Sequence, residues 1–582
     1  MHLLSTAADA GTVGQQQVAG SAGSAAEPAG FCNPLAGTPK QETAPQPFEK
    51  IPGPGAVDVE AYNARNHQYI VELHEKYGDI VAVDMSSMAR AANGAPTKRV
   101  LFVRKPEMAK AVLRHSAFAK TWDAAEVSAD TVDYVHNLVQ PLLAATVFNK
   151  QGEGGAHHGR MALRPMFNAV KQLSAGFAEQ IDEALKAWPV DGGIDALGSC
   201  HDLIRQALLF AIAGSAAPRA NAATESVFHE VMDYFVERYS SSGHDACATA
   251  EDEATMAKAM DAGLRIVQAW REHGQSGTSE AEQKTMLAVM SEAGNSDEEM
   301  AAMVINAIIA GAEAPASTLA QFLQELAFNA PLQTALAAEI AAGAPAGTEV
   351  LDVLDKLTFV DDCVMEALRF FAPATLVQRV AVKPTQLGGY EVPPGTVVGI
   401  CVTAVHRDAT VHENPWTFDP LGRRGKLNLQ VLKEEDCFMT FGGGPRGCPG
   451  KNLGKMMLRI ALAKIVQRSE FYSNQRRGCD HLSQPAGGGG KGIPKFVEWQ
   501  VGGIPLQIRP QPLRTDTAEQ QQRRPRGQWS AFLPSRYTVA AAGAAALLGL
   551  SNAIQPLLLE LESAAGLSEW AEAALGVHNV TN

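Results

Sequence analysis

The sequence predicts a mainly α-helical fold that carries small β-sheets. Apolar residues recur with helical periodicity from about residue 106 to residue 371. Two strand-like apolar runs precede this stretch at 80–83 and 100–103, and a β-type region with Gly- and Pro-rich turns follows it at 377–403. Residues 501–508 read as one further strand. We therefore expect a mostly helical body with a few short strands.

The composition of the chain changes at both ends of this body. Residues 1–47 are rich in Ala, Gly, Ser, Gln and Pro, which predicts a disordered low-complexity extension. We place the folded domain at 48–512, and a linker with an Ala/Leu-rich extension at 513–582. Residues 537–559 contain no charge and are long enough to cross a bilayer, yet they include two glycines and a proline. We expect them to pack on the body or to contact a membrane surface, with a tail anchor as the alternative.

Net charge and cysteine usage narrow the class of protein. The formal net charge is −14, which argues against nucleic-acid binding. The eight cysteines are scattered and form no C-x-x-C pair, so neither a zinc site nor a disulfide framework is predicted. We expect an intracellular protein, soluble or peripherally membrane-associated. The N-terminal extension fits a plastid transit peptide only loosely, because it contains no arginine.

A glycine-rich loop at 441–450 surrounds Cys448 and precedes a helix-like stretch. A cysteine that binds haem iron is a thiolate, and backbone N–H groups and a helix N-terminus stabilise its charge. Glycines at Gly442 and Gly450 let the backbone approach the sulfur and adopt positive φ. The loop alone also fits an inert, buried cysteine in a Gly-rich turn.

The joint pattern F-x-x-G-x-R-x-C-x-G decides between these readings. It resembles the haem-binding loop of the cytochrome P450 family, and the resemblance covers roughly residues 51–511. The resemblance implies the P450 fold and haem b, with Cys448 as the axial ligand of the iron. Phe441 would shield the sulfur side of the ring, and Arg446 would pair with a haem propionate.

A second motif, Glu366 and Arg369, has i, i+3 spacing that puts both charges on one helix face. By itself this is an ordinary surface ion pair. It resembles the E-x-x-R pair of the P450 family, which implies that it is buried and locks the cysteine loop. The third member of that group is expected to be Arg423, with Arg424 as the alternative, because the arginine follows its proline later than in the family pattern.

A long, largely uncharged helix is expected at 301–328, and such a helix is buried. Its centre resembles the stretch that crosses the distal face of the haem in the P450 family, where an acid followed by threonine delivers protons to iron-bound oxygen. Glu313 supplies the acid, but Ala314 replaces the threonine. Pro315 removes a backbone donor, which frees a carbonyl, and Ser317 is the nearest hydroxyl that could lie near the same face.

Three basic side chains besides Arg446 are candidates for the haem propionates. The resemblance assigns Arg160 and Arg379 to this role, with His157 as a donor in place of a missing tryptophan. His406, by contrast, is expected to be a structural histidine. A basic stripe of Lys451, Lys455 and Arg459 reads either as a docking surface for an acidic electron donor or as a solvated helix face.

The resemblance implies a monooxygenase. It would activate dioxygen and insert one oxygen atom into an apolar or amphipathic small organic substrate. Electrons would come from a separate reductase or ferredoxin, because no flavin or iron–sulfur motif is present in the sequence. The missing alcohol at Ala314 leaves a second hypothesis, an enzyme that rearranges or dehydrates a peroxide without a reductase. A haem-binding sensor is the third.

Overall fold

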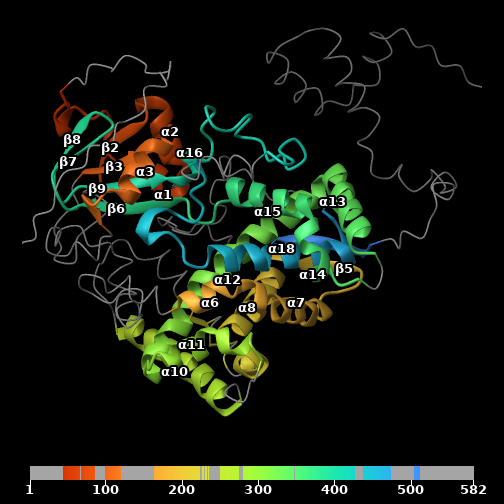
Figure 1. Cartoon of the computed structure of the whole chain (residues 1–582). Helices are drawn as coiled ribbons and strands as arrows, with labels where there is room; N and C mark the ends of the chain where they lie inside the picture. The colour runs from red at the N-terminus through yellow and green to blue at the C-terminus, as the bar shows by residue number, and fades with distance from the viewer. Residues whose placement is uncertain are drawn as a thin grey trace, which may run out of the picture.

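The computed structural model of the chain describes residues 44–65, 67–85, 99–119, 163–222, parts of 224–234, 250–273, 279–345, 348–426, 437–473 and 504–511. Figure 1 shows a group of long helices joined to a region that contains most of the strands. The prediction of a mainly helical fold with small sheets is confirmed. The predicted domain boundaries stay predictions, since residues 1–43 of the first extension and all of the second lie outside the described residues.

The described helices have the following bounds: α1 Val59–Arg65, α2 His67–Tyr77, α3 Pro106–Arg114, α6 Arg164–Asn168, α7 Val170–Lys186, α8 Ala196–Ala213, α10 Ala250–His273, α11 Met286–Glu292, α12 Asp297–Phe328, α13 Ala330–Gly343, α14 Val350–Val353, α15 Thr358–Phe370, α16 Val402–Val405 and α18 Lys451–Arg468. The described helices from α3 to α15 lie within residues 106–371, where the sequence has helical periodicity.

The centre of the helical group is α12, which packs against α8, α10, α13, α15 and α18 (Figure 1). Its start is fixed by a capping box, in which Ser296 accepts from the Glu299 N–H while the Glu299 carboxylate accepts from the Ser296 N–H. The helix continues through Pro315 to Phe328. Among the described residues, α12 alone has the length and hydropathy of a membrane span, and 67% of that apolar window is buried inside the fold.

Three sheets complete the described part of the fold. The largest has the order β1 Gly55–Ala56, β2 Ile80–Asp84, β3 Arg99–Val103, β9 Val397–Cys401, β6 Leu376–Ala381 and β4 Phe118–Ala119. Its β1–β2 and β3–β9 pairs are parallel and the others antiparallel. The second sheet joins β10 Ser469–Tyr472, β11 Pro505–Pro510 and β5 Gly192–Asp195, and the third pairs β7 Thr385–Leu387 with β8 Tyr390–Val392.

Both faces of the large sheet are covered, which explains why its central strands read as continuous apolar runs. On β3, Leu101 and Val103 belong to the cluster that includes α3, whereas Val100 and Phe102 belong to the cluster that includes α2. The sheet is thereby held between the two helices, and the C-terminal end of α3 is brought to the segment Gly444–Arg446 of the cysteine loop.

Candidate functional site

Cys448 is the exposed cysteine among the five that the structure describes. Cys200, Cys363 and Cys401 are buried, and burial raises the pKa of the Cys401 thiol to about 11, which keeps it protonated. In contrast, the loop presents Cys448 at its surface. The structure therefore contradicts the alternative of an inert, buried cysteine in this loop.

Backbone hydrogen bonds fold the loop back on itself. The Cys448 N–H donates to the Phe441 carbonyl at 2.8 Å, and the Gly442 N–H donates to the Met439 carbonyl at 2.9 Å. Gly450 immediately precedes α18, and a Cβ placed on it would lie 3.9 Å from the Cys448 sulfur. The sulfur thus lies beside the N-terminus of α18, whose dipole favours a negative charge.

Gly444 is required by two independent features of the loop. Its φ is +64°, in the region that side chains other than glycine rarely adopt. A Cβ at this position would also overlap the carbonyl oxygen of Leu113 at the end of α3. Gly442 likewise has a φ of +63°. The glycines therefore allow a tight turn packed closely against a helix end.

Glu366 and Arg369 form a fully buried, bidentate ion pair on α15. Arg369 Nε lies 2.8 Å from Glu366 Oε2, and Nη2 lies 2.9 Å from Oε1. The remaining donors of Arg369 bind the carbonyls of His406, Pro415 and Thr417 at 2.9–3.1 Å. One guanidinium thus ties α15 to the segment that follows α16.

The structure brings Arg423, rather than Arg424, to this pair. Arg423 Nε donates to Glu366 Oε1 at 3.1 Å, whereas Arg424 contacts Glu339 at 3.4 Å. A helix-like turn, in which the Arg423 N–H donates to the Asp419 carbonyl at 3.2 Å, carries the late arginine back to the carboxylate. The Asp419 N–H adds a further donor at 3.0 Å. The geometry of Glu366, Arg369 and Arg423 suits the expected locking role, which stays a prediction.

His406 connects this buried group to the cysteine loop, a connection that the sequence did not reveal. The Met439 N–H donates to His406 Nε2 at 2.7 Å, so Nδ1 carries the proton and donates to the Arg369 carbonyl at 3.0 Å. Burial lowers the pKa of His406 well below its usual value, which keeps the ring neutral. The ring also stacks on Phe438, with centroids 5.3 Å apart. Nearby, the Thr440 hydroxyl donates to the Leu368 carbonyl at 2.7 Å.

The middle of α12 has an open stripe of small residues. Ala310 is exposed, and Ala307, Gly311 and Ala314 are half-buried, although most of the helix is buried. These positions share one helix face. Glu313 lies about 100° around the helix from Ala314, and its Oε1 is 3.1 Å from Nδ1 of His201 on α8.

Ser317 and Thr318, the nearest hydroxyls along α12, are both buried and hydrogen-bonded. Ser317 accepts from Gln321 Nε2 at 3.2 Å, and Thr318 donates to the Ala314 carbonyl at 3.0 Å. The predicted role of Ser317 near the distal face stays a prediction. Sequence reasoning missed His201, because nothing in its surroundings along the chain marks it.

The candidate propionate ligands are only partly described. Arg379 lies on β6, is buried, and donates to the Gln378 carbonyl at 2.7 Å. Arg446 is half-buried in the cysteine loop. Arg160 and His157 lie outside the described residues. All four assignments stay predictions.

The basic stripe on α18 is partly occupied by contacts within the fold. Arg459 forms an ion pair with Asp361 on α15 and donates to the Leu354 carbonyl at 3.0 Å. Burial lowers the pKa of Lys455. Arg459 therefore faces the acidic first turn of α15, and it does not contribute to an open docking surface.

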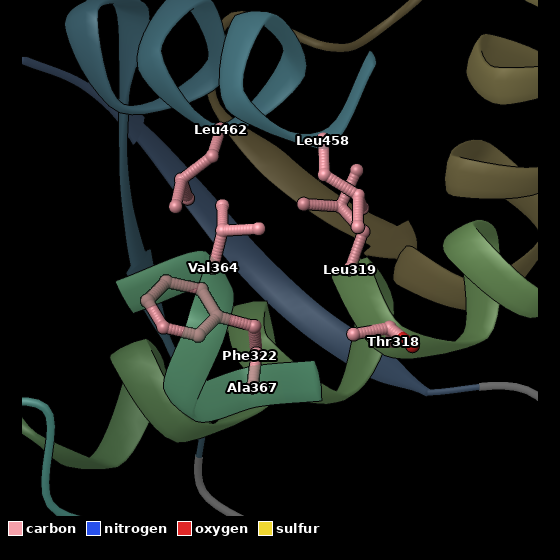
Figure 2. A pocket seen from close by; sticks show the side chains of 7 residues that line it. All are labelled: Thr318, Leu319, Phe322, Val364, Ala367, Leu458 and Leu462. Atoms are coloured by element: carbon pink, nitrogen blue, oxygen red, sulfur yellow. The ribbon is translucent and has the colours of Figure 1, made fainter. Parts of the chain in front are cut away.

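A small apolar gap lies between α12, α15 and α18 (Figure 2). Figure 2 shows side chains from the three helices around it: Thr318, Leu319, Phe322, Val364, Ala367, Leu458 and Leu462. None of them belongs to the cysteine loop. This gap is a packing feature of the helical group and is separate from the site around Cys448.

The described residues fit a haem. The thiol of Cys448 is exposed on a glycine-supported loop at a helix N-terminus, and α12 presents an open stripe of alanine and glycine against which a flat ring could lie. In the comparison with protein families, the model described as cytochrome P450 matches residues 45–490. The chain belongs to the cytochrome P450 family. Members of this family hold haem through a cysteine thiolate.

Individual P450 proteins are similar to this chain over shorter stretches. Cytochrome P450 3A15 of Cavia porcellus is 33% identical over 180 residues, which are 30% of this chain and 35% of the relative. Cytochrome P450 6a2 of Drosophila melanogaster is 33% identical over 216 residues, 36% of this chain and 40% of the relative. Cytochrome P450 78A7 of Arabidopsis thaliana is 31% identical over 190 residues. The chain thus covers well under half of the length of these relatives.

Proposed function

We propose that this protein is a haem-thiolate monooxygenase. It inserts one oxygen atom of dioxygen into an apolar or amphipathic small organic substrate and receives electrons from a separate donor protein, a reductase or a ferredoxin. The observation that carries the proposal is the exposed thiol of Cys448, whose loop is connected through His406 to the buried Glu366–Arg369 pair. The bound haem supplies the chemistry of dioxygen activation.

The chain contributes a rigid proximal support and an acid on the opposite side. Backbone hydrogen bonds hold the glycine loop in its turn, and the N-terminus of α18 stabilises the thiolate of Cys448. Alanine side chains at Ala310 and Ala314 leave space along α12 for a substrate. Glu313, which lies next to that space, serves as its proton donor.

The replacement of threonine by Ala314 favours a second candidate, a P450-fold enzyme that rearranges or dehydrates a peroxide. Such an enzyme takes no electrons from a partner and has less need for an alcohol that orders water on the distal helix. A haem-binding sensor is a third candidate, because an exposed thiol in this loop serves haem binding with or without turnover.

The first experiment tests the ligand. The reduced, carbon-monoxide-bound holoprotein is expected to show its Soret band at the thiolate position, and Cys448→Ala is expected to lose that band. Cys437→Ala provides the matched control, since Cys437 is buried eleven residues away and should leave the band unchanged. If the band survives in Cys448→Ala while far-ultraviolet circular dichroism shows a preserved fold, the assignment of the iron ligand is wrong.

The second experiment separates the candidate functions. A monooxygenase forms a product that contains oxygen from ¹⁸O-labelled dioxygen, and it requires NAD(P)H together with a supplied reductase. Rapid consumption of a lipid hydroperoxide without dioxygen or reductase would instead support the second candidate. A protein that binds haem and forms no product under either condition fits the sensor.

A further inference from the structure

A histidine from a neighbouring helix contacts the acid on α12. Nδ1 of His201 lies 3.1 Å from Oε1 of Glu313. The N-cap Asp195 fixes the start of α8, because its carboxylate accepts from the N–H groups of Leu197 and Gly198. Close packing of α8 on α12 at Gly311, where an added Cβ would lie 3.1 Å from Leu208, keeps the two helices together.

The two side chains differ in solvent exposure, and together they connect the surface with the middle of α12. The side chain of His201 is 27% exposed, whereas that of Glu313 is 12% exposed. A carboxylate accepts hydrogen bonds, so the nitrogen that faces Glu313, Nδ1, carries a proton. The other ring nitrogen, Nε2, is not used by this contact. Imidazole transfers protons near neutral pH, which makes it a suitable connection between solvent and a half-enclosed acid.

Charged groups on α8, and on α7 and α10 that pack against it, form ion pairs of their own. On α8, Arg205 lies 2.9 Å from Asp202 and also contacts Asn221. On α10, the ion pairs are Arg271 with Asp297, Arg265 with Asp261 and Lys258 with Glu230, and on α7 Asp182 pairs with Lys464 of α18. Within the described part of the chain, His201 is the basic side chain that contacts the Glu313 carboxylate.

We propose that His201 is the proton relay that serves Glu313 and that it keeps this acid supplied with protons although the alcohol at Ala314 is missing. His201 binds a solvent proton at Nε2 and releases its Nδ1 proton to Oε1 of Glu313. The carboxylic acid formed in this way donates the proton to the distal space and returns to a carboxylate. His201 is left with its proton on Nε2, and rotation of the ring with exchange of that proton through solvent restores the Nδ1–H form, so each cycle moves one proton inward. His201 acts through Glu313 and is a positioning residue. The inference rests on the proposed monooxygenase function.

The test uses the haem-loaded protein and four variants: His201→Gln, Glu313→Gln, the double variant, and the control His273→Gln, which changes an exposed histidine on α10. Product formed per NAD(P)H consumed measures the coupling of electrons to oxygen insertion. A positioned proton donor contributes about 10²–10⁴-fold to its step; because Glu313 remains in place in His201→Gln, we expect coupling to fall about tenfold in that variant. The double variant should be no worse than Glu313→Gln, since both residues belong to one relay.

A second measurement does not depend on turnover. Isotope-edited infrared difference spectra between the wild type and Glu313→Gln isolate the Glu313 carboxylate band. His201→Gln should shift this band, whereas His273→Gln should leave it in place. As the reverse measurement, ¹⁵N NMR of labelled histidine should show a change at His201 Nδ1 in Glu313→Gln, which keeps the test valid if a His201 variant fails to fold.

The outcomes separate the relay from the proposed function. An unshifted carboxylate band, coupling within twofold of the wild type, or additive losses in the double variant would each overturn the relay, even if the protein is a monooxygenase. Conversely, a wild type that forms no dioxygen-dependent product would overturn the proposed function and with it the relay, while the shifted band would still establish the contact between His201 and Glu313.

Discussion

Replacement of Arg369 by lysine tests whether the buried ion pair supports the cysteine loop. Arg369 makes five hydrogen bonds, two to the Glu366 carboxylate and three to backbone carbonyls. A lysine supplies three donors from a single point, so at least two of these acceptors lose their partner. An unsatisfied buried polar group costs about 1–3 kcal/mol. Arg369→Lys should therefore lower the free energy of unfolding by roughly 2–6 kcal/mol, a large part of the roughly 5–15 kcal/mol of a typical domain.

The assay combines urea unfolding, followed by circular dichroism, with the carbon-monoxide spectrum of the reduced protein. We expect a lower urea midpoint and partial loss of the thiolate Soret band, because the carbonyl of His406 is one of the acceptors that Arg369 binds. Arg424→Lys is the matched control: its guanidinium is 51% exposed and 3.4 Å from Glu339, and such pairs contribute about 0–1 kcal/mol. If the free energy of unfolding of Arg369→Lys is within about 1 kcal/mol of the wild-type value and the thiolate Soret band is fully kept, the buried ion pair does not support the cysteine loop.

Three further predictions address the loop, the pH dependence and the distal helix. Gly444→Ala should destabilise the cysteine loop, since the positive φ and the contact with the Leu113 carbonyl both disfavour a Cβ, and reduced haem retention after gel filtration measures this. Burial lowers the pKa of His74 to about 4. Between pH 6.5 and 4 the unfolded chain therefore binds more protons than the folded chain. The stability present above pH 6.5 is lost as the pH falls through this range. The full loss is about 3 kcal/mol, and urea titrations of His74→Leu should show a flatter pH dependence by that amount. Ala314→Thr should raise the yield of oxygenated product per NAD(P)H if the site merely lacks a donor, whereas a collapse of activity would show that Ala314 makes room for a substrate group.

The parts of the site that the sequence predicts are those whose chemistry requires neighbours along the chain. The pattern F-x-x-G-x-R-x-C-x-G places all its members within ten residues, so the loop around Cys448 is recognisable as one segment. Glu366 and Arg369 are likewise three residues apart on one helix, and the structure joins them as their spacing indicates. The strands of the large sheet were predictable for a similar reason, because burial on both faces leaves continuous apolar runs.

The remaining connections depend on tertiary packing, which no local pattern contains. The choice between Arg423 and Arg424 depends on a turn whose shape is fixed by the Asp419 carbonyl and by the distant Glu366 carboxylate. His406 reaches Met439 across 33 residues of sequence, and only the folded chain shows that both ring nitrogens are used. A buried histidine with both nitrogens bonded looks the same in sequence as an exposed one.

The distal side of the site gives a chemical reason to prefer one proposed function. Insertion of one oxygen atom from dioxygen consumes two electrons and two protons and releases water, whereas rearrangement or dehydration of a peroxide takes up no net proton. A protein of the second kind has no use for an acid connected to solvent through a histidine. Glu313 lies beside the open alanine stripe and contacts the more exposed His201, which is the arrangement that repeated proton uptake requires. In the proposed relay, the loss of the alcohol at Ala314 does not by itself remove proton delivery, because Glu313 and His201 contact each other independently of that position.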